Sequence, residues 1–426
     1  MKKIISIVSA VALAVGLTVA AAPSAFAACG GDLKIYFQGA LTGPYAETGI
    51  NEANGVILAI DKYNATNPKT KVAYDAIDTE ASGSKSPALA AKVVADECAI
   101  AVVGGMYSGE TLAAVPIYEG GKVPVVSPSA TNPALTNKSP YFHRVVGSDL
   151  VQGPALAQIA IGLKSKLFVV DDATAYGKGL ATIVKKNASK IIVGTDGVTE
   201  GTTNFTSVVA KVAKAKATAV FYGGYYPEAA IFIKALRDNP ATKKVAFIAG
   251  DGVLDGEFIK LAKKNAEGAY LTAPGEPMDK VAPALAKEYK AKFNRDHGLY
   301  TLEAYNSAYV LLQGIKAGKT TRDALNTWLG EAVVKAVGST ILGVIINKIP
   351  ESSLEYEYGY RYGYPRYYGA NYRPYAKRGA DEGQYAPSAD VLDRQALEDN
   401  FQHIKGQRFK EELKRQDSRT PTSKRI

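Results

Sequence analysis

The sequence predicts an α/β protein made of two lobes, each a doubly wound parallel sheet, with a hinge and a cleft between them. Its 426 residues, 47% of them hydrophobic, are enough for at least two domains. Short apolar runs alternate with amphipathic segments, which is typical of βαβ units, and this alternation begins at Leu33 and again after Asp149. Ligands of open α/β sheets bind beyond the carboxyl ends of the strands, so we expect the binding site in the cleft.

Residues 1–28 have the layout of a secretory signal peptide. Two lysines precede an apolar run from Ile4 to about Ala22, and small residues follow around Ala25 to Ala27. The run ends without the charged stop-transfer residues of a membrane anchor, so we expect export followed by cleavage. An uncleaved N-terminal anchor would also place the protein outside the cytoplasm.

Cys29 lies where a lipoprotein signal places its acylated cysteine. Phe26, however, occupies the position where that signal usually has a leucine. Lipid anchoring at Cys29 and simple cleavage after Ala27 therefore both stay open. The expected location is the periplasm or the outer face of the cytoplasmic membrane.

The chain has few residues that could build a disulfide framework or a metal site. Cys98 is the only other cysteine, so one disulfide is compatible with an oxidising compartment but does not follow from the sequence. His143, His297 and His403 are not at ligand spacing from one another or from a cysteine. We expect no metal and no cofactor.

The formal net charge of +10 does not indicate nucleic-acid binding. The positive residues are lysines scattered over presumed helix faces, together with a basic C-terminal end. In an exported protein this pattern is typical of a solvated surface.

The first lobe is expected over residues 29–147. Val56, Ile57, Ala59 and Ile60 mark the apolar face of its first helix. In chain order the predicted elements are a strand at 34–37, helices at 51–63 and 87–98, a strand at 100–104, a helix at 109–118 and a strand at 123–127.

The second lobe is expected over residues 148–271, and residues 272–331 return to the first lobe. The predicted elements of the second lobe are a helix at 152–163 and strands at 167–171, 191–193, 219–222 and 246–249. Segments 142–147 and 268–274 are expected to be extended crossovers, because the helical pattern resumes only from about Pro283.

Hydroxyl-bearing residues follow two strands of the first lobe. Ser108 comes after the strand at 100–104, where a helix begins and offers backbone N–H groups to an anion. Ser129 and Thr131 follow the next strand, ahead of Pro133. These residues predict a carboxylate site, although a simple helix cap would explain each of them alone.

Six stretches in register resemble the leucine/isoleucine/valine-binding family of ABC transporter substrate-binding proteins, the type I periplasmic binding proteins. The resemblance covers about residues 32–330. The stretches are 39–44, VVGGMYSGETLAAVPIYE at 102–119, SPSATNPALT at 127–136, FHRVVGSDLVQGPA at 142–155, VVDDATAYGKGLA at 169–181 and FYGGYYPEAA at 221–230.

The resemblance implies that the pocket holds a zwitterion, with the carboxylate end in the first lobe. Ser108, Ser129 and Thr131 would hold the α-carboxylate, together with nearby backbone that includes Ala130. These positions coincide with the strand-end hydroxyls described above.

The ammonium end is implied to lie in the second lobe. Asp251 would hold the α-ammonium with Tyr225 beside it, and Tyr176 would close over the ligand. Some relatives have the longer glutamate at the position of Asp251, which changes the reach of the carboxylate. Tyr45 and Tyr107 are further candidates for the wall around the ligand side chain.

The function implied is an exported solute-binding protein. It would capture a small free amino acid, first of all leucine, isoleucine or valine, by cleft closure and deliver it to the membrane permease of an ABC importer. We expect a monomer. The alternative is an exported sensing or surface-attachment protein that uses the tyrosine-rich tail for interactions.

Neither of two glycine-rich stretches supports an enzyme. Residues 314–320 resemble a phosphate-binding loop, but Gln313 occupies the position of its first glycine and a helix precedes it. Gly177 and Gly179 lack the third glycine of a dinucleotide loop. We therefore do not expect an enzyme.

The C-terminal part departs from the family. Residues 332–350 form a short apolar segment whose packing the sequence does not decide. Residues 351–426 form a tyrosine-rich and charged tail, predicted to be mostly disordered because no helical or strand period can build a core. Its tyrosine cluster weakly resembles the C-terminus of bacterial tyrosine autokinases, but those enzymes need a Walker A loop that this sequence lacks.

Overall fold

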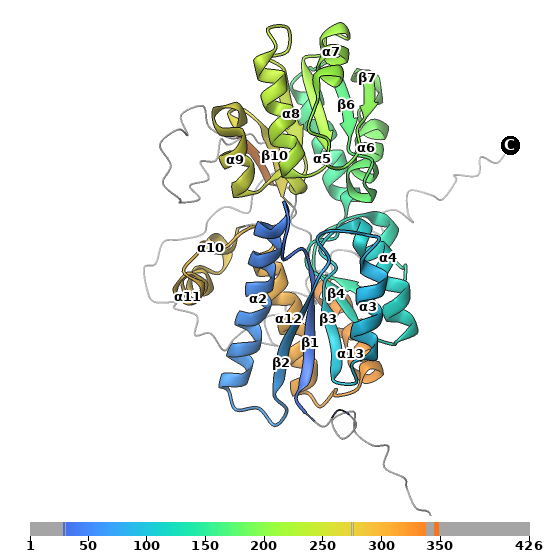
Figure 1. Ribbon diagram of the computed structural model, residues 1–426, viewed down its shortest axis with the longest axis vertical. Helices are drawn as coiled ribbons and strands as arrows, with labels where there is room; N and C mark the ends of the chain where they lie inside the picture. The colour runs from blue at the N-terminus through green and yellow to red at the C-terminus, as the bar shows by residue number, and fades with distance from the viewer. Residues whose placement is uncertain (1–28, 30, 274, 276, 338–344, 349–426) are drawn as a thin grey trace, which may run out of the picture.

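The computed structural model describes residue 29 and residues 31–273, 275, 277–337 and 345–348, with side chains described up to residue 330. Within this part the chain forms two α/β lobes, one above the other in Figure 1. The predicted signal peptide and tyrosine-rich tail lie outside the described residues. No helix in the described part of the chain is long and apolar enough to cross a membrane.

The first lobe contains a five-stranded parallel sheet in the order β2-β1-β3-β4-β5. Its strands are β1 (Leu33–Gly39), β2 (Val72–Asp78), β3 (Ala99–Val103), β4 (Val125–Ser127) and β5 (Phe142–Arg144). Its helices are α2 (Ala46–Ala65), α3 (Ser86–Ala95), α4 (Ser108–Gly120), η1 (Pro133–Leu135), α10 (Met278–Val281), α11 (Pro283–Phe293), α12 (Thr301–Lys316) and α13 (Arg322–Val337).

Alternate residues of β1 face opposite layers of this lobe. Ile35 and Phe37 pack into the apolar cluster formed with α2 and α12, whereas Tyr36 packs into the cluster formed with α3 and α4. Helices therefore cover both faces of the sheet, which confirms the doubly wound prediction.

The second lobe contains a six-stranded sheet in the order β11-β10-β9-β8-β6-β7. Its strands are β6 (Leu167–Asp171), β7 (Ile192–Gly197), β8 (Ala219–Gly223), β9 (Ala246–Ala249), β10 (Tyr270–Ala273) and β11 (Ile345–Lys348). Its helices are α5 (Asp149–Gly162), α6 (Ala175–Asn187), η2 (Ser189–Ile191), α7 (Thr206–Lys214), α8 (Tyr226–Asp238), η3 (Asp251–Val253), α9 (Gly256–Ala262) and η4 (Lys263–Ala266). All its strand pairs are parallel except β10 with β11.

The two predicted crossover segments are themselves strands, which corrects the prediction from sequence. β5 pairs with β4 at the edge of the first sheet, and β10 pairs with both β9 and β11 in the second. Each crossing follows its strand, so the second lobe extends to Ala273 rather than ending at residue 271. Short edge strands carry little apolar signal: all three residues of β5 are only half-buried.

The apolar segment at 332–350 also has a defined place where the structure describes it. Its first residues continue α13, which packs on the first lobe, and β11 joins the edge of the second sheet antiparallel to β10. The chain thus crosses between the lobes a third time, after α13.

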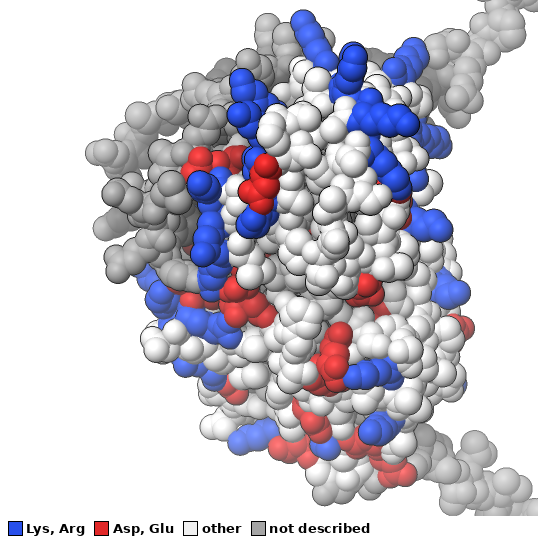
Figure 2. Space-filling view, turned by 45° about the horizontal axis from the view of Figure 1, so that its top comes forward, with Lys and Arg blue, Asp and Glu red and all other residues white. Residues whose placement is uncertain are grey.

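Charged side chains are dispersed over the face seen in Figure 2. Over the second lobe Lys and Arg predominate and several of them adjoin one another, whereas over the first lobe they alternate with Asp and Glu. Among the described residues no group of His, Cys, Asp and Glu could hold a metal ion.

Candidate functional site

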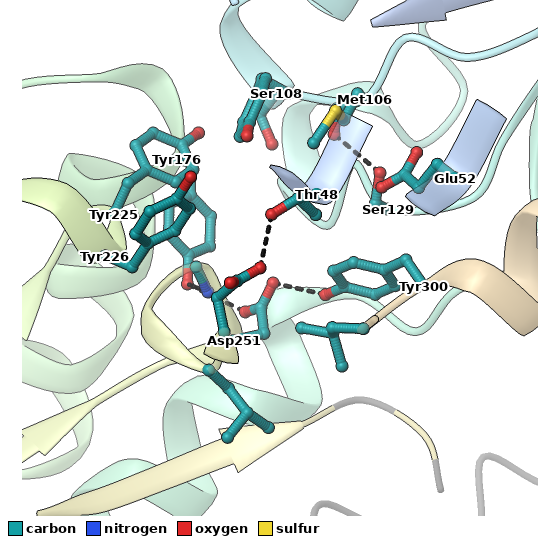
Figure 3. Close-up of a pocket in the computed structure, with 15 residues that line it drawn as sticks. Thr48, Glu52, Met106, Ser108, Ser129, Tyr176, Tyr225, Tyr226, Asp251 and Tyr300 are labelled. Atoms are coloured by element: carbon teal, nitrogen blue, oxygen red, sulfur yellow. Dashed lines mark hydrogen bonds between the residues drawn. The ribbon is translucent and has the colours of Figure 1, made fainter. Parts of the chain in front are cut away.

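A pocket lies between the lobes, at the carboxyl ends of both sheets, and spans about 430 Å³ when its part open to solvent is included. Both lobes contribute to its wall (Figure 3). The lining residues from the first lobe are Thr48, Glu52, Met106, Tyr107, Ser108, Ser129, Leu299 and Tyr300. Those from the second lobe are Tyr176, Tyr225, Tyr226, Asp251, Gly252, Leu254 and Asp255.

Ser108, the first residue of α4, is buried in the pocket wall. Its Oγ accepts a hydrogen bond from the Asn132 backbone N–H at 3.3 Å, which leaves its own proton to donate. The Asn132 side chain in turn donates to the carbonyl of Ala175 in the second lobe, at 2.5 Å. Ser108 therefore presents a donor at a helix N-terminus beside a contact between the lobes.

Of the three predicted site residues in the loop after β4, only one lines the pocket. Ser129 lines the pocket and donates to the Met106 carbonyl at 2.9 Å. Ala130 and Thr131 do not line it, and the Ala130 N–H is already taken by Ser127 Oγ at 3.0 Å. The Thr131 Oγ1 is buried and has no hydrogen-bond partner among the described residues.

Asp251 lies at the start of η3, two residues after β9 ends, and is only 5% exposed. The Tyr176 hydroxyl donates to its Oδ1 at 2.9 Å, and the Tyr300 hydroxyl donates to its Oδ2 at 2.5 Å. Burial raises the pKa of Asp251, and the two tyrosine hydrogen bonds oppose this shift. A cation in the pocket would stabilise the ionised form of this acid.

Tyrosine rings form the wall beside Asp251. Tyr176 and Tyr225 stack with ring centroids 5.1 Å apart, and Tyr107 meets Tyr225 edge-on at 4.9 Å. Tyr107 and Tyr225 come from different lobes, so the ring contact exists only while the lobes are together. Faces of this kind attract an ammonium group.

Three further carboxyl groups are buried near the pocket. Glu52 lines it, is fully buried and has no hydrogen-bond partner for either oxygen among the described residues; burial raises its pKa well above the usual range. Burial, reinforced by the charge of Asp251, raises the pKa of Asp149 to about 8. Burial raises the pKa of Asp172 to about 7.

Further hydrogen bonds join the two lobes, some of them made by residues of the pocket wall. The Tyr45 hydroxyl lies 3.2 Å from a carboxylate oxygen of Glu228 and 3.3 Å from a carboxylate oxygen of Glu200. The Thr48 hydroxyl donates to the Asp255 carboxylate at 2.7 Å. The Tyr226 hydroxyl donates to the Pro44 carbonyl at 2.5 Å. The structure is therefore closed. Tyr45, a candidate for the pocket wall, instead serves as one of these bridges, whereas Tyr107 does line the pocket.

Close packing explains why glycine occupies the two positions, Gly177 and Gly179, that suggested a dinucleotide loop. A Cβ on Gly177 would lie 2.4 Å from the Gly223 carbonyl oxygen, and one on Gly179 would lie 2.8 Å from the Asn132 side-chain nitrogen. The start of α6 thus approaches β8 and the first lobe too closely for any side chain.

Sequence reasoning missed several pocket residues, chiefly Tyr300, Glu52 and Thr48. Tyr300 follows the return to the first lobe, 49 residues after Asp251, and has a left-handed backbone with φ of 65° just before α12. Glu52 and Thr48 lie on the first helix after β1, where an acid inside an apolar face was the only available signal.

Comparison with known proteins supports the same fold. The sequence model of the family described as periplasmic binding protein matches residues 33–341. The leucine-, isoleucine-, valine-, threonine-, and alanine-binding protein of Pseudomonas aeruginosa is 32% identical over 297 residues, which is 67% of this chain and 79% of that protein. The leucine-specific-binding protein of Salmonella typhimurium is 32% identical over 64% of this chain and 76% of its own length.

A solved structure also matches the chain. The branched-chain amino acid transporter substrate binding protein LivJ from Streptococcus pneumoniae, in complex with isoleucine, superimposes with a TM-score of 0.68 over 76% of this chain and 98% of that one. At 24% sequence identity, this structural similarity shows that the two proteins share a fold.

Proposed function

This chain belongs to the periplasmic binding protein family, and we propose that it captures a free amino acid of the leucine, isoleucine and valine class for an ABC importer. The family resemblance deduced from the six sequence stretches is thereby confirmed, and the chain is a binding protein rather than an enzyme. One observation carries the ligand proposal: hydroxyls of the first lobe and a buried carboxylate of the second line the same pocket between the lobes.

A zwitterionic amino acid matches this arrangement of charges. Burying either of its charges costs several kcal/mol unless the charge is paired. The Ser108 hydroxyl offers a donor to the carboxylate, and Ser129 would offer one by turning its proton away from the Met106 carbonyl, while Asp251 offers its charge to the ammonium. We assign Thr131 and backbone around Ala130 a supporting part at the carboxylate end.

The binding energy expected from such a site is moderate. A hydrogen bond to a charged group contributes roughly 1.5 to 3 kcal/mol, and four or five of them, less the cost of ordering, correspond to a Kd on the order of micromolar. Cation–π attraction from the rings of Tyr176 and Tyr225 contributes further binding energy for the ligand ammonium.

The rest of the wall suits an aliphatic side chain. Met106, Leu254 and Leu299 line the pocket together with tyrosine rings. The two curated relatives are named for binding leucine or leucine with other small amino acids, which supports this class over the sensing or attachment role.

Capture requires closure, because the two charged ends of the ligand meet different lobes. The closed form is then the state that the membrane permease of the importer recognises. We propose that the protein works as a monomer in the periplasm, where the family to which it belongs acts.

Calorimetry on the exported chain tests the proposal. Leucine, isoleucine and valine should each bind with 1:1 stoichiometry, and D-leucine, whose charged groups are misplaced relative to its side chain, should bind far more weakly. If none of the twenty common amino acids raises the melting temperature or gives a binding isotherm, the proposal is wrong.

A further inference from the structure

Cys29 and Cys98 lie at the same end of two neighbouring strands. β1 pairs with β3 in parallel with Lys34 opposite Ala99, and the Lys34 N–H donates to the Cys98 carbonyl at 2.7 Å. Cys98 directly precedes β3, and Cys29 lies four residues before the start of β1. This is the amino end of the sheet, opposite the carboxyl ends that face the pocket.

The two cysteines are in contact there. The Cys98 thiol donates to the Cys29 backbone carbonyl at 3.1 Å, although 69 residues separate them in the chain. The neighbouring Cys29 thiol, followed by burial, raises the pKa of Cys98 to about 11.

The Cys29 side chain contacts the first lobe, while its thiol donates to the Gly31 carbonyl at 3.1 Å. It is half-buried and packs against the apolar cluster of the first lobe that includes Leu33 and Ile35. A cysteine that carried a membrane lipid would instead have to present its sulfur to the bilayer.

We propose that Cys29 and Cys98 form a disulfide in the exported protein, and hence that Cys29 is not the site of a lipid anchor. Two S–H bonds break and one S–S bond forms. The two electrons and two protons pass to an exported thiol–disulfide oxidase, whose own disulfide is reduced to a dithiol. Lipid attachment would use the same Cys29 sulfur for a thioether, so the two modifications exclude each other.

The disulfide ties the start of the mature chain to the sheet of the first lobe. It closes a loop from residue 29 to residue 98, and long loops of this kind stabilise a fold mainly by restricting the unfolded chain. Because the bond lies at the end of the sheet away from the pocket, it leaves ligand affinity unchanged.

Thiol labelling of the protein exported to an oxidising periplasm tests the proposal directly. Under denaturing conditions, iodoacetamide should modify neither cysteine before reduction and both after it, and a non-reducing peptide digest should contain one species joining Cys29 to Cys98. Two labelled thiols without reduction, or a diacylglyceryl group on Cys29 by mass spectrometry, would overturn it.

Thermal unfolding provides a second test, which distinguishes the stability contributed by the disulfide from that contributed by packing of the cysteine side chains. Cys29→Ser, Cys98→Ser and the double variant should lose the same several degrees of melting temperature, and reductant should lower the wild-type protein to that value while leaving the variants unchanged. A wild-type melting temperature insensitive to reductant contradicts the disulfide. Neither test uses a ligand, so a protein that has the bond but binds no amino acid would refute only the proposed function.

Discussion

The Tyr300 hydroxyl donates to the Asp251 carboxylate across the boundary between the lobes, with 2.5 Å between the two oxygens. Asp251 follows β9 of the second lobe and Tyr300 precedes α12 of the first, while Tyr176 donates to the other carboxylate oxygen. The acid proposed to hold the ligand ammonium is therefore oriented by both lobes, and its position depends on closure.

Removing the charge of Asp251 should weaken binding more than any other change to the pocket. Asp251→Asn keeps the size of the side chain and one acceptor oxygen for a tyrosine hydroxyl but loses the second acceptor and the ion pair, so we expect leucine affinity by calorimetry to fall on the order of 100-fold. Asp323→Asn, at an exposed site on α13, is the matched control and should bind as the wild type does. Unchanged affinity in Asp251→Asn would remove this residue from the site.

The carboxylate end should respond to loss of single hydroxyls. Ser108→Ala removes one donor to the ligand carboxylate, and Thr131→Ala removes the supporting hydroxyl that we propose beside it, so we expect about tenfold weaker leucine binding for each. Ser84→Ala, at an exposed serine of the same lobe, serves as control. Should Thr131→Ala bind normally while Ser108→Ala does not, Thr131 would have a purely structural role, consistent with its absence from the pocket lining.

Closure should depend on a hydrogen bond outside the pocket. Tyr45→Phe removes the bridge to Glu228 and Glu200 and should reduce leucine affinity by about three- to tenfold, because the closed state is less populated. Tyr36→Phe removes a comparable hydrogen bond, to Asp96 within the first lobe, and should lower stability without changing affinity. Equal effects of the two variants on affinity would contradict the bridging role.

Without ligand, stability should fall as the pH rises toward 8. Burial raises the pKa of Asp149 to about 8 and those of Asp172, Glu110 and Glu303 each to about 7, so the folded state retains protons that the unfolded state has already released. The stabilising contribution of these carboxyl groups to the free energy of unfolding is complete below the ordinary carboxyl pKa of the unfolded chain. It is lost as the pH rises through their raised pKa values in the folded state.

Melting curves at several pH values check this effect. We expect a melting temperature several degrees lower at about pH 8 than at about pH 5.5, and a shallower dependence in Asp149→Asn. A melting temperature that rises steadily over this interval would show that these carboxyls are ionised in the folded protein.

Ligand binding should release protons from Asp251. Burial raises the pKa of this acid in the empty pocket, and an ammonium beside it favours the ionised form, so affinity should weaken as the medium becomes more acidic. Calorimetry in two buffers with different ionisation enthalpies measures the protons released per ligand. A release that persists unchanged in Asp251→Asn would assign it to another group.

The predicted fold followed from local patterns. Runs such as those at β3, β6 and β8 are buried at nearly every residue, and their flanking helices carry apolar faces, so each element could be recognised alone. β5 and β10 were misinterpreted as crossovers because they are short. Their strand character comes from hydrogen bonds to a neighbouring strand, which a sequence pattern does not reveal.

The site was predictable where a polar residue lies in the loop or turn after a buried strand, as Ser108, Ser129 and Asp251 do. The family resemblance added Tyr176 and Tyr225, which also line the pocket. Thr48, Glu52 and Tyr300 were not found, because they lie on or before helices that also carry many residues with no part in the site.

The sequence by itself determined the two α/β lobes, export, and the chemistry of the strand ends, because these depend on periodicity and residue type over short stretches. Only the tertiary structure decided which distant groups meet: Tyr300 with Asp251, Tyr45 with Glu228, and Cys29 with Cys98. The physical reason is that these contacts depend on how strands are ordered in a sheet and how one lobe rests on the other. That arrangement sets hydrogen-bond and packing distances of a few ångströms. Contacts of this kind produce no periodic pattern of residues in the sequence, so the sequence does not reveal them.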